Sequence, residues 1–266
     1  MLTYRKCNPL YGYRWLAEGI KLFFSQPWPW LALVGVSLLA MLLLSLLPFL
    51  GLIAIFTLFP GIAAGFMFAS QAAMEPKPIN FQQLLTGFKT TARPLLALGG
   101  HTFLIFFIAL VIILLGWREE FQQLVGLMQN QASDRAALMS AAQELKLPSI
   151  LALGVLLVLA VATWFAPALV VFRQVDARTA MRLSLRACLN NFAPFLVFSV
   201  LLILLDLVTS FFLRLMLSAF RSIGGEQVAN TATMFFTFPI VCAFIASIFA
   251  AAYISYRDVF ESTPAP

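Results

Sequence analysis

An isolated acid, Asp206, lies within a long apolar run, where an ionised carboxylate in hydrocarbon costs about 2.5–3.5 kcal/mol or more. Thr209, Ser210 and Arg214 follow it at helical spacing, so all four share roughly one face of the expected helix. Such a face is typical of an ion- or proton-responsive site. It is equally typical of a buried polar lock, in which the acid is bonded to hydroxyls or to Arg214. Both interpretations stay open.

His101 is the single histidine, about two turns into another apolar run, beside Gly99, Gly100 and Thr102. A neutral imidazole donates one hydrogen bond and accepts another, so His101 is a candidate proton relay. The alternative is a histidine that only satisfies helix packing. At 1.5 Å per residue, its depth differs from that of Asp206 by about 9 Å, so we expect no direct contact.

Arg178, Arg182 and Arg186 recur every fourth residue, beside an apolar stripe of Met181, Leu185, Cys188, Leu189 and Phe192. This pattern predicts an interfacial amphipathic helix over 174–191 whose cations meet anionic lipid headgroups on the cytosolic side, each contributing about 1 kcal/mol. The alternative is that these charges only fix the membrane orientation.

The composition indicates an all-α integral membrane protein. Hydrophobic residues make up 62% and charged residues 11% of the chain, unlike a soluble domain. Several runs of about 20 residues can cross a bilayer. The chain forms a single polytopic domain over 1–266 with about six expected transmembrane helices: 30–47, 50–73, 94–115, 148–172, 192–213 and 233–256.

The basic residues predict that both termini are cytoplasmic. With the N-terminus inside, the outer segments hold Arg118, Arg135, Lys146, Arg214 and Arg221, and the other twelve of the 17 lysines and arginines are inside. The net charge of +6 is therefore a positive-inside pattern, and a nucleic-acid partner is not expected.

Three similar units recur along the chain. An amphipathic segment precedes a proline and an apolar pair of helices at 11–26, 81–91 and 174–191, which predicts three helix-plus-hairpin repeats. Residues 1–28 form the cytosolic and interfacial N-terminal segment, with Trp28 and Trp30 expected at the membrane interface. Pro60, Pro167 and Pro239 each fall within a returning span, where they bend the helix.

Small residues line one face of the second span. Gly61, Gly65, Ala69 and Ala73 recur every fourth residue and predict a helix-packing seam. An internal neighbour is the expected partner, and homodimerisation is the alternative.

Residues 117–147 predict an extracytoplasmic excursion of two short amphipathic helices broken near Ser133 and Asp134. It either packs on the bundle or acts as a lid or docking hairpin.

No motif indicates a reaction. One membrane acid is too few for intramembrane aspartyl proteolysis, and Gly35, Ser37 and His101 are a weak match to a rhomboid-like pair. No HExxH, Walker A or GxSxG sequence occurs. Cys7, Cys188 and Cys242 are scattered and read as free thiols. We therefore expect no enzyme activity, no catalytic residue, no cofactor and no metal site.

The segments AMRLSLRACLNNFAPF at 180–195, FAPALVVF and WLAEGIKLFFSQP carry a resemblance. Through them the chain resembles an uncharacterised family of proteobacterial polytopic inner-membrane proteins, over most of its length. The resemblance implies a bacterial inner membrane and a six-span plan. It implies no activity, so no site residue is carried over.

Two functional hypotheses follow. The first is a non-enzymatic inner-membrane protein that organises membrane lipids or partner membrane proteins, with a homo-oligomer as one form of partner. The second is a small transporter or proton-coupled permeation protein that uses Asp206, with His101 as a secondary candidate. A membrane enzyme is a more distant third.

Overall fold

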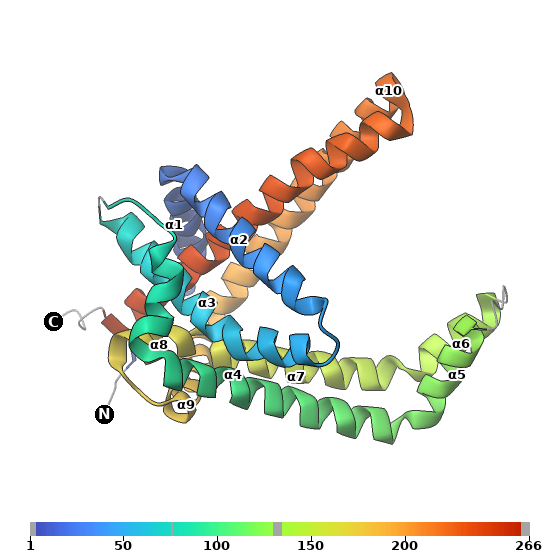
Figure 1. Cartoon of the computed structure of the whole chain (residues 1–266), viewed down its shortest axis with the longest axis horizontal. Coiled ribbons are helices and arrows are strands. Elements are labelled where there is room, and N and C mark those ends of the chain that lie inside the picture. The colour runs from blue at the N-terminus through green and yellow to red at the C-terminus, as the bar shows by residue number, and fades with distance from the viewer. Residues whose placement is uncertain (1–3, 76, 130–134, 262–266) are drawn as a thin grey trace.

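The computed structural model describes residues 4–75, 77–129 and 135–261, and the regular structure within these ranges is helical (Figure 1). The expected all-α class is thus confirmed. The helices of the first half are α1 (Tyr11–Ser25), α2 (Pro27–Ser45), α3 (Leu50–Met74), α4 (Gln82–Gly116) and α5 (Arg118–Gln129). Those of the second half are α6 (Arg135–Glu144), α7 (Lys146–Trp164), α8 (Ala166–Arg173), α9 (Ala177–Asn190), α10 (Phe192–Tyr256) and the π-helical turn η1 (Arg257–Glu261).

Five helical stretches of the described chain are long and apolar enough to cross a membrane: α2, α3, α4, α7 with α8, and α10 with η1. The last contains two arms, because Gly225 has φ 71° and ψ −170° and the chain reverses there (Figure 1). That backbone region is essentially open only to glycine. The molecule therefore has six arms of membrane length, at the positions of the six predicted spans.

Prolines and kinks divide the arms as the sequence indicates. In α4 the backbone leaves helical geometry at Thr91 (φ −138°, ψ 33°), three residues before Pro94, so the amphipathic piece and the span are distinct. Pro60 and Pro239 lie inside α3 and α10, and Pro167 begins α8 just after the break at Phe165. Pro60 and Pro239 each remove a backbone hydrogen bond inside a helix, whereas Pro167 stands in the first turn of α8, where the N–H has no intrahelical partner.

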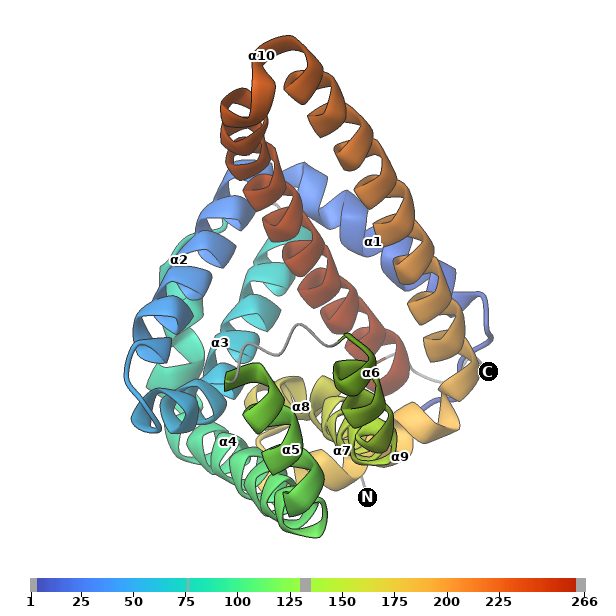
Figure 2. The same cartoon turned by 90° about the vertical axis from the view of Figure 1, so that its right-hand side faces the viewer.

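The three helix-plus-hairpin units pack in a cyclic order. The short helix α1 packs on α10 of the third unit, the first part of α4 packs on α3 of the first unit, and α9 packs on α7 of the second unit. In Figure 2 the outgoing arms α2, α4 and the first arm of α10 lie at the periphery, and the returning arms lie nearer the middle. Each hairpin therefore rests on the short helix of the next unit.

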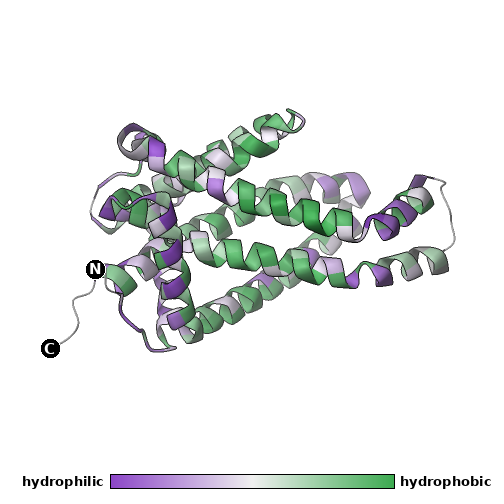
Figure 3. Ribbon diagram, turned by 90° about the horizontal axis from the view of Figure 1, so that it is seen from below, coloured by the Kyte–Doolittle hydropathy of each residue, from purple (hydrophilic) through white to green (hydrophobic). Residues whose placement is uncertain are grey.

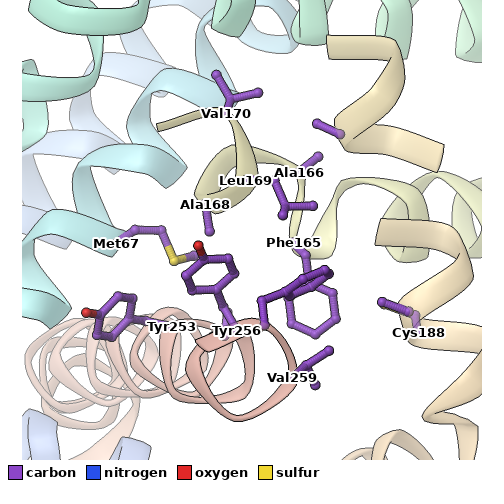
Figure 4. Packing of buried hydrophobic residues seen from close by; sticks show 14 of the residues in the cluster. Met67, Phe165, Ala166, Ala168, Leu169, Val170, Cys188, Tyr253, Tyr256 and Val259 are labelled. Carbon is purple, nitrogen blue, oxygen red and sulfur yellow. The ribbon is translucent and has the colours of Figure 1, made fainter. Parts of the chain in front are cut away.

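The packed core lies at the end of the molecule that holds both termini, opposite α5, α6 and the α10 turn (Figure 1). We call this end the hub; it comprises α1, α8, α9, η1 and the adjoining ends of the arms. Aromatic side chains join its elements: the ring of Phe165 lies 5.4 Å from that of Phe260, and Trp15 lies 5.2 Å from Phe195. Figure 4 shows Phe165, Tyr256 and Val259 meeting between α8, α10 and η1.

The arms beyond the hub are apolar along most of their length, as the hydropathy colouring of Figure 3 shows, and many of their large apolar side chains are exposed. Examples are Leu153 and Leu157 on α7 and Phe211 and Phe212 on α10. In a bilayer these side chains face lipid tails, so the arms form a membrane region that is held together mainly at one end.

One expectation for the N-terminal region is wrong. Trp30 is fully buried rather than at the membrane interface: its ring stacks on Phe66 at 6.3 Å and its indole N–H donates to the carbonyl of Leu22 at 3.2 Å. Trp28 alone is exposed. In addition, α1 buries its apolar face against α10, because Gly12 and Gly19 let the two backbones approach closely.

Residues 117–147 contain two short helices, α5 and α6, at the tip of the second hairpin (Figure 1). The predicted break near Ser133 and Asp134 lies outside the described residues. Apolar side chains of α4, α5 and α7 line a cleft of about 200 Å³ beneath α5, among them Phe106, Phe121 and Val155. No residue of α5 is buried, so the structure shows where this excursion lies and leaves its role as a prediction.

Candidate functional site: the basic face of the hub

Arg178, Arg182 and Arg186 are exposed along one side of α9. The opposite side, with Ala177, Ala180, Ser184, Ala187 and Cys188, is buried. The Asp176 side chain caps the helix by accepting a hydrogen bond from the Thr179 N–H at 3.1 Å. Hydrogen bonding by the Thr179 side chain, followed by that of its backbone N–H, lowers the pKa of Asp176. Ser184 fixes α9 on α7, because its hydroxyl donates to the Val161 carbonyl at 2.8 Å. The arginines therefore stand on a helix that cannot easily rotate.

The buried side of α9 differs from the predicted apolar stripe. Small residues carry the packing, whereas Leu189 and Phe192 are exposed and Met181 and Leu185 are half-buried. Small side chains allow α9 to lie close to α7, which the pattern of large apolar residues did not indicate. The exposed Leu189 follows Arg178 by three turns of α9 and so lies on the same face as the arginines, as expected at a headgroup interface.

His101 contacts Arg178, not Asp206. The Nε of Arg178 lies 3.2 Å from Nε2 of His101, and Nδ1 of His101 lies 2.5 Å from the Ala97 carbonyl oxygen. This contact joins α4 to the start of α9 and places the histidine beside the arginine row. The residue patterns predict a separate role for each residue and do not predict the pair, because the contact depends on how two distant helices approach.

Asp206, Thr209, Ser210 and Arg214 all lie on the first arm of α10. Asp206 and Arg214 are exposed, and Thr209 and Ser210 are half-buried. Among the described residues, none forms a hydrogen bond or an ion pair with the Asp206 carboxylate. The second arm therefore supplies no polar partner, and this chain alone does not assemble a polar pathway around the acid.

The predicted small-residue seam faces α4. A Cβ on Gly61 would lie 2.0 Å from the Phe88 ring, and a Cβ on Gly65 would lie 2.5 Å from the Cα of Leu84. Ala69 is buried among Trp30, Phe66 and Ala246, and Ala73 is partly buried at the same cluster. The glycines thus bring two helices of one chain together.

A polar cleft of about 150 Å³ at the hub was missed by sequence reasoning. Its lining includes Arg14, Glu18, Arg257, Asp258 and Glu261. The Asp258 carboxylate accepts a hydrogen bond from the Trp15 indole at 3.0 Å and lies 3.6 Å from the Arg14 guanidinium. The sequence signal for this cleft was the acid Asp258, in the segment RDVFE after the last span. Its partners, Arg14 and Trp15, lie near the opposite end of the sequence.

The three cysteines are buried free thiols. Burial raises the pKa of Cys188 to about 12 and also raises that of Cys7. Within the described part of the chain, no three histidine, cysteine, aspartate or glutamate side chains gather as metal ligands. All three thiols therefore take part in the packing of the hydrophobic core.

The arms, the hub and the exposed apolar surface define a polytopic helical membrane protein. The chain is similar to a probable inner membrane protein of Burkholderia thailandensis, with 28% identity over 253 residues that cover 94% of this chain and 90% of the relative. This finding confirms the resemblance to proteobacterial inner-membrane proteins. No protein-family model matches the chain, and no solved structure matches it.

Proposed function

We propose that this chain is a non-enzymatic inner-membrane protein that binds anionic lipid headgroups at the hub and so organises the lipid around its hairpins. The exposed row of Arg178, Arg182 and Arg186 on the fixed helix α9 carries the proposal. The name of the Burkholderia relative supports the location, and the positive-inside distribution supports a cytosolic hub.

The energetics favour binding at this row. Each cation near an anionic membrane surface contributes about 1 kcal/mol, and three arginines on one rigid helix act together. Guanidinium groups also match the geometry of phosphate oxygens. Because the hairpins meet mainly at the hub, lipids gathered there would also fill the space beside the exposed arms.

The test replaces all three arginines with glutamine. After purification in detergent and exchange into mixed phosphatidylcholine and phosphatidylglycerol, the phosphatidylglycerol retained per protein is quantified. We expect a severalfold reduction relative to the unmodified chain. The matched control replaces Arg118, Arg214 and Arg221, at the other end of the hairpins, and should retain the same lipid as the unmodified chain. Equal loss in both triple variants would contradict the proposal.

The second candidate function is a permeation protein that uses Asp206, favoured by the exposed, unpaired acid on an otherwise apolar arm. Because the described residues of this chain provide no partner, such a pathway would need a second copy or another membrane protein beside α10. Asp206→Cys in a chain without native cysteines tests it. Rapid labelling by a membrane-impermeant thiol reagent would support a water pathway, and no labelling in folded protein would reject it.

A further inference from the structure

The contact between α4 and α9 selects one tautomer of the neutral His101 ring. The Nε of an arginine only donates, so Nε2 of His101 must accept, and the proton of the neutral ring is on Nδ1. Nδ1 then donates to the Ala97 carbonyl. In this state the imidazole holds one nitrogen of Arg178 and leaves the two terminal nitrogens of the guanidinium to other partners.

The charges around this pair are mostly positive. Helix α4 packs on α3, α5, α7, α8 and α9. The charged residues of α5, Arg118, Glu119 and Glu120, lie at the tip of the hairpin, away from the hub. No residue of α3 is charged, and Lys146 of α7 lies at the far end of its arm. On α8, Arg173 donates to the Phe260 carbonyl at 2.7 Å.

Arg182 follows Arg178 by one turn of α9, and Arg93 precedes His101 by about two turns of α4. The one nearby acid, Asp176, caps α9.

We propose that His101, Arg178 and Arg182 form a phosphate site at the cytosolic membrane interface, and that protonation of His101 strengthens phosphate binding. The site rests on the proposed function and gives it a specific headgroup contact. Its ligand is the phosphate of an anionic lipid or a free phosphate ion, which offer the same oxygens.

The physical reason lies in the direction of the hydrogen bond. When His101 gains a proton, Nε2 changes from acceptor to donor and points at the Arg178 Nε–H, 3.2 Å away. Two donors and two positive charges then face each other, and a phosphate oxygen between them satisfies both. Binding and protonation therefore favour each other, so phosphate affinity rises as pH falls.

The experiment measures binding of a short-chain phosphatidylglycerol to the full chain in zwitterionic micelles at pH 7.5 and pH 5.5. We expect about fivefold tighter binding at pH 5.5, the size of one added surface cation. His101→Gln can still accept from Arg178 but does not titrate, so it should keep the affinity at pH 7.5 and lose the increase. Arg186→Gln, on the same helix face, should bind more weakly at both pH values and keep the ratio.

The outcomes of these measurements support or overturn the phosphate site, and they separate it from the proposed function. A fivefold ratio that persists in folded His101→Gln would overturn the inference. Competition by millimolar inorganic phosphate would support the site with free phosphate as its ligand, and lipid binding without such competition would support it with the headgroup. If the triple arginine variant loses lipid but His101→Gln behaves as the unmodified chain, only this inference fails. If the triple variant loses nothing, the proposed function fails as well.

Discussion

At the scale of residues, Asn191 is the polar side chain that ties the N-terminal segment to the hub. It is fully buried, and its carboxamide oxygen accepts a hydrogen bond from the Cys7 N–H at 2.7 Å. Its amide nitrogen donates to the carbonyls of Arg5 at 3.0 Å and Ala187 at 2.9 Å. A buried backbone group that loses its partner carries the full cost of desolvation.

Asn191→Ala should therefore lower the free energy of unfolding by about 1–3 kcal/mol, because it leaves the Cys7 N–H and the Arg5 carbonyl unsatisfied. Thermal unfolding in detergent measures the loss, and faster proteolysis before Tyr11 would show where it acts. Asn190→Ala, at the exposed neighbouring position, is the control and should cost less. Equal stability of the Asn191 variant and the unmodified chain would refute the prediction.

Cys188 should be unreactive in the folded protein. Its raised pKa of about 12 keeps the thiol protonated at pH 8, and burial excludes the reagent. Since the folded pKa exceeds that of the unfolded chain, this group contributes stability below pH 9 that is lost as pH rises toward 12. In a chain with Cys188 as its single cysteine, maleimide labelling should be slow until denaturant is added. Leu189→Cys without Cys188, at the adjacent exposed position, should label quickly.

Single-residue sequence reasoning was most successful for the arginines, whose spacing of four residues predicts one exposed row. It failed for Trp30 and for the pairing of His101 with Arg178. An indole suits both an interface and a core, and a contact across 77 residues depends on the packing of complete helices.

At the scale of elements, Gly65 sets the distance between α3 and α4. A Cβ there would meet the backbone of Leu84, with its Cα at 2.5 Å and its carbonyl oxygen at 2.9 Å. Because backbone cannot move aside as a flexible side chain can, the helices would have to separate.

Gly65→Ala should destabilise the protein by about 1–3 kcal/mol through this overpacking. Gly154→Ala on α7 is the matched control, because a Cβ there meets no atom within 4 Å. It should be neutral or slightly stabilising, since alanine favours the helix. Differential scanning fluorimetry of both variants in the same detergent compares them. A Gly65 variant as stable as the Gly154 variant would show that the helices tolerate separation.

Element boundaries were predictable where composition changes sharply. The apolar runs predict α2 and α3 closely, and the amphipathic piece before Pro94 is separated from its span by the Thr91 kink. The arms of α10 extend past the predicted runs to Gly225, because the segment between them has no proline and glycine first interrupts it at Gly224.

At the scale of the whole molecule, the N-terminal segment contacts the turn that follows the last arm. The Arg5 N–H donates to the Val259 carbonyl at 2.8 Å, so we expect both segments on one side of the membrane. An even number of crossings follows, in agreement with six arms. The repeated units could be predicted from the sequence, but their cyclic packing could not, because each short helix packs on an arm of another unit.

Reporter fusions test the orientation. A fusion at the C-terminus should be active only with a cytoplasmic reporter, and a fusion after Gly225 should be active only with a periplasmic one, because the positive-inside distribution favours a cytosolic hub. Lysine or arginine substitutions at exposed outer positions should weaken this bias. A periplasmic signal from the C-terminal fusion would contradict the predicted topology.

The packing of α1 on α10 has a consequence for synthesis. Gly12 and Gly19 lie against Pro194, Ser247 and Ala251, so α1, which is synthesised well before α10, docks on both arms of the last hairpin. During translation the apolar face of α1 has no final partner, and the membrane surface is the place where such a helix rests. The ring of units closes only when the last hairpin is inserted. A ribosome that stalls before Phe192 would therefore leave a chain whose first helix still lacks its docking site.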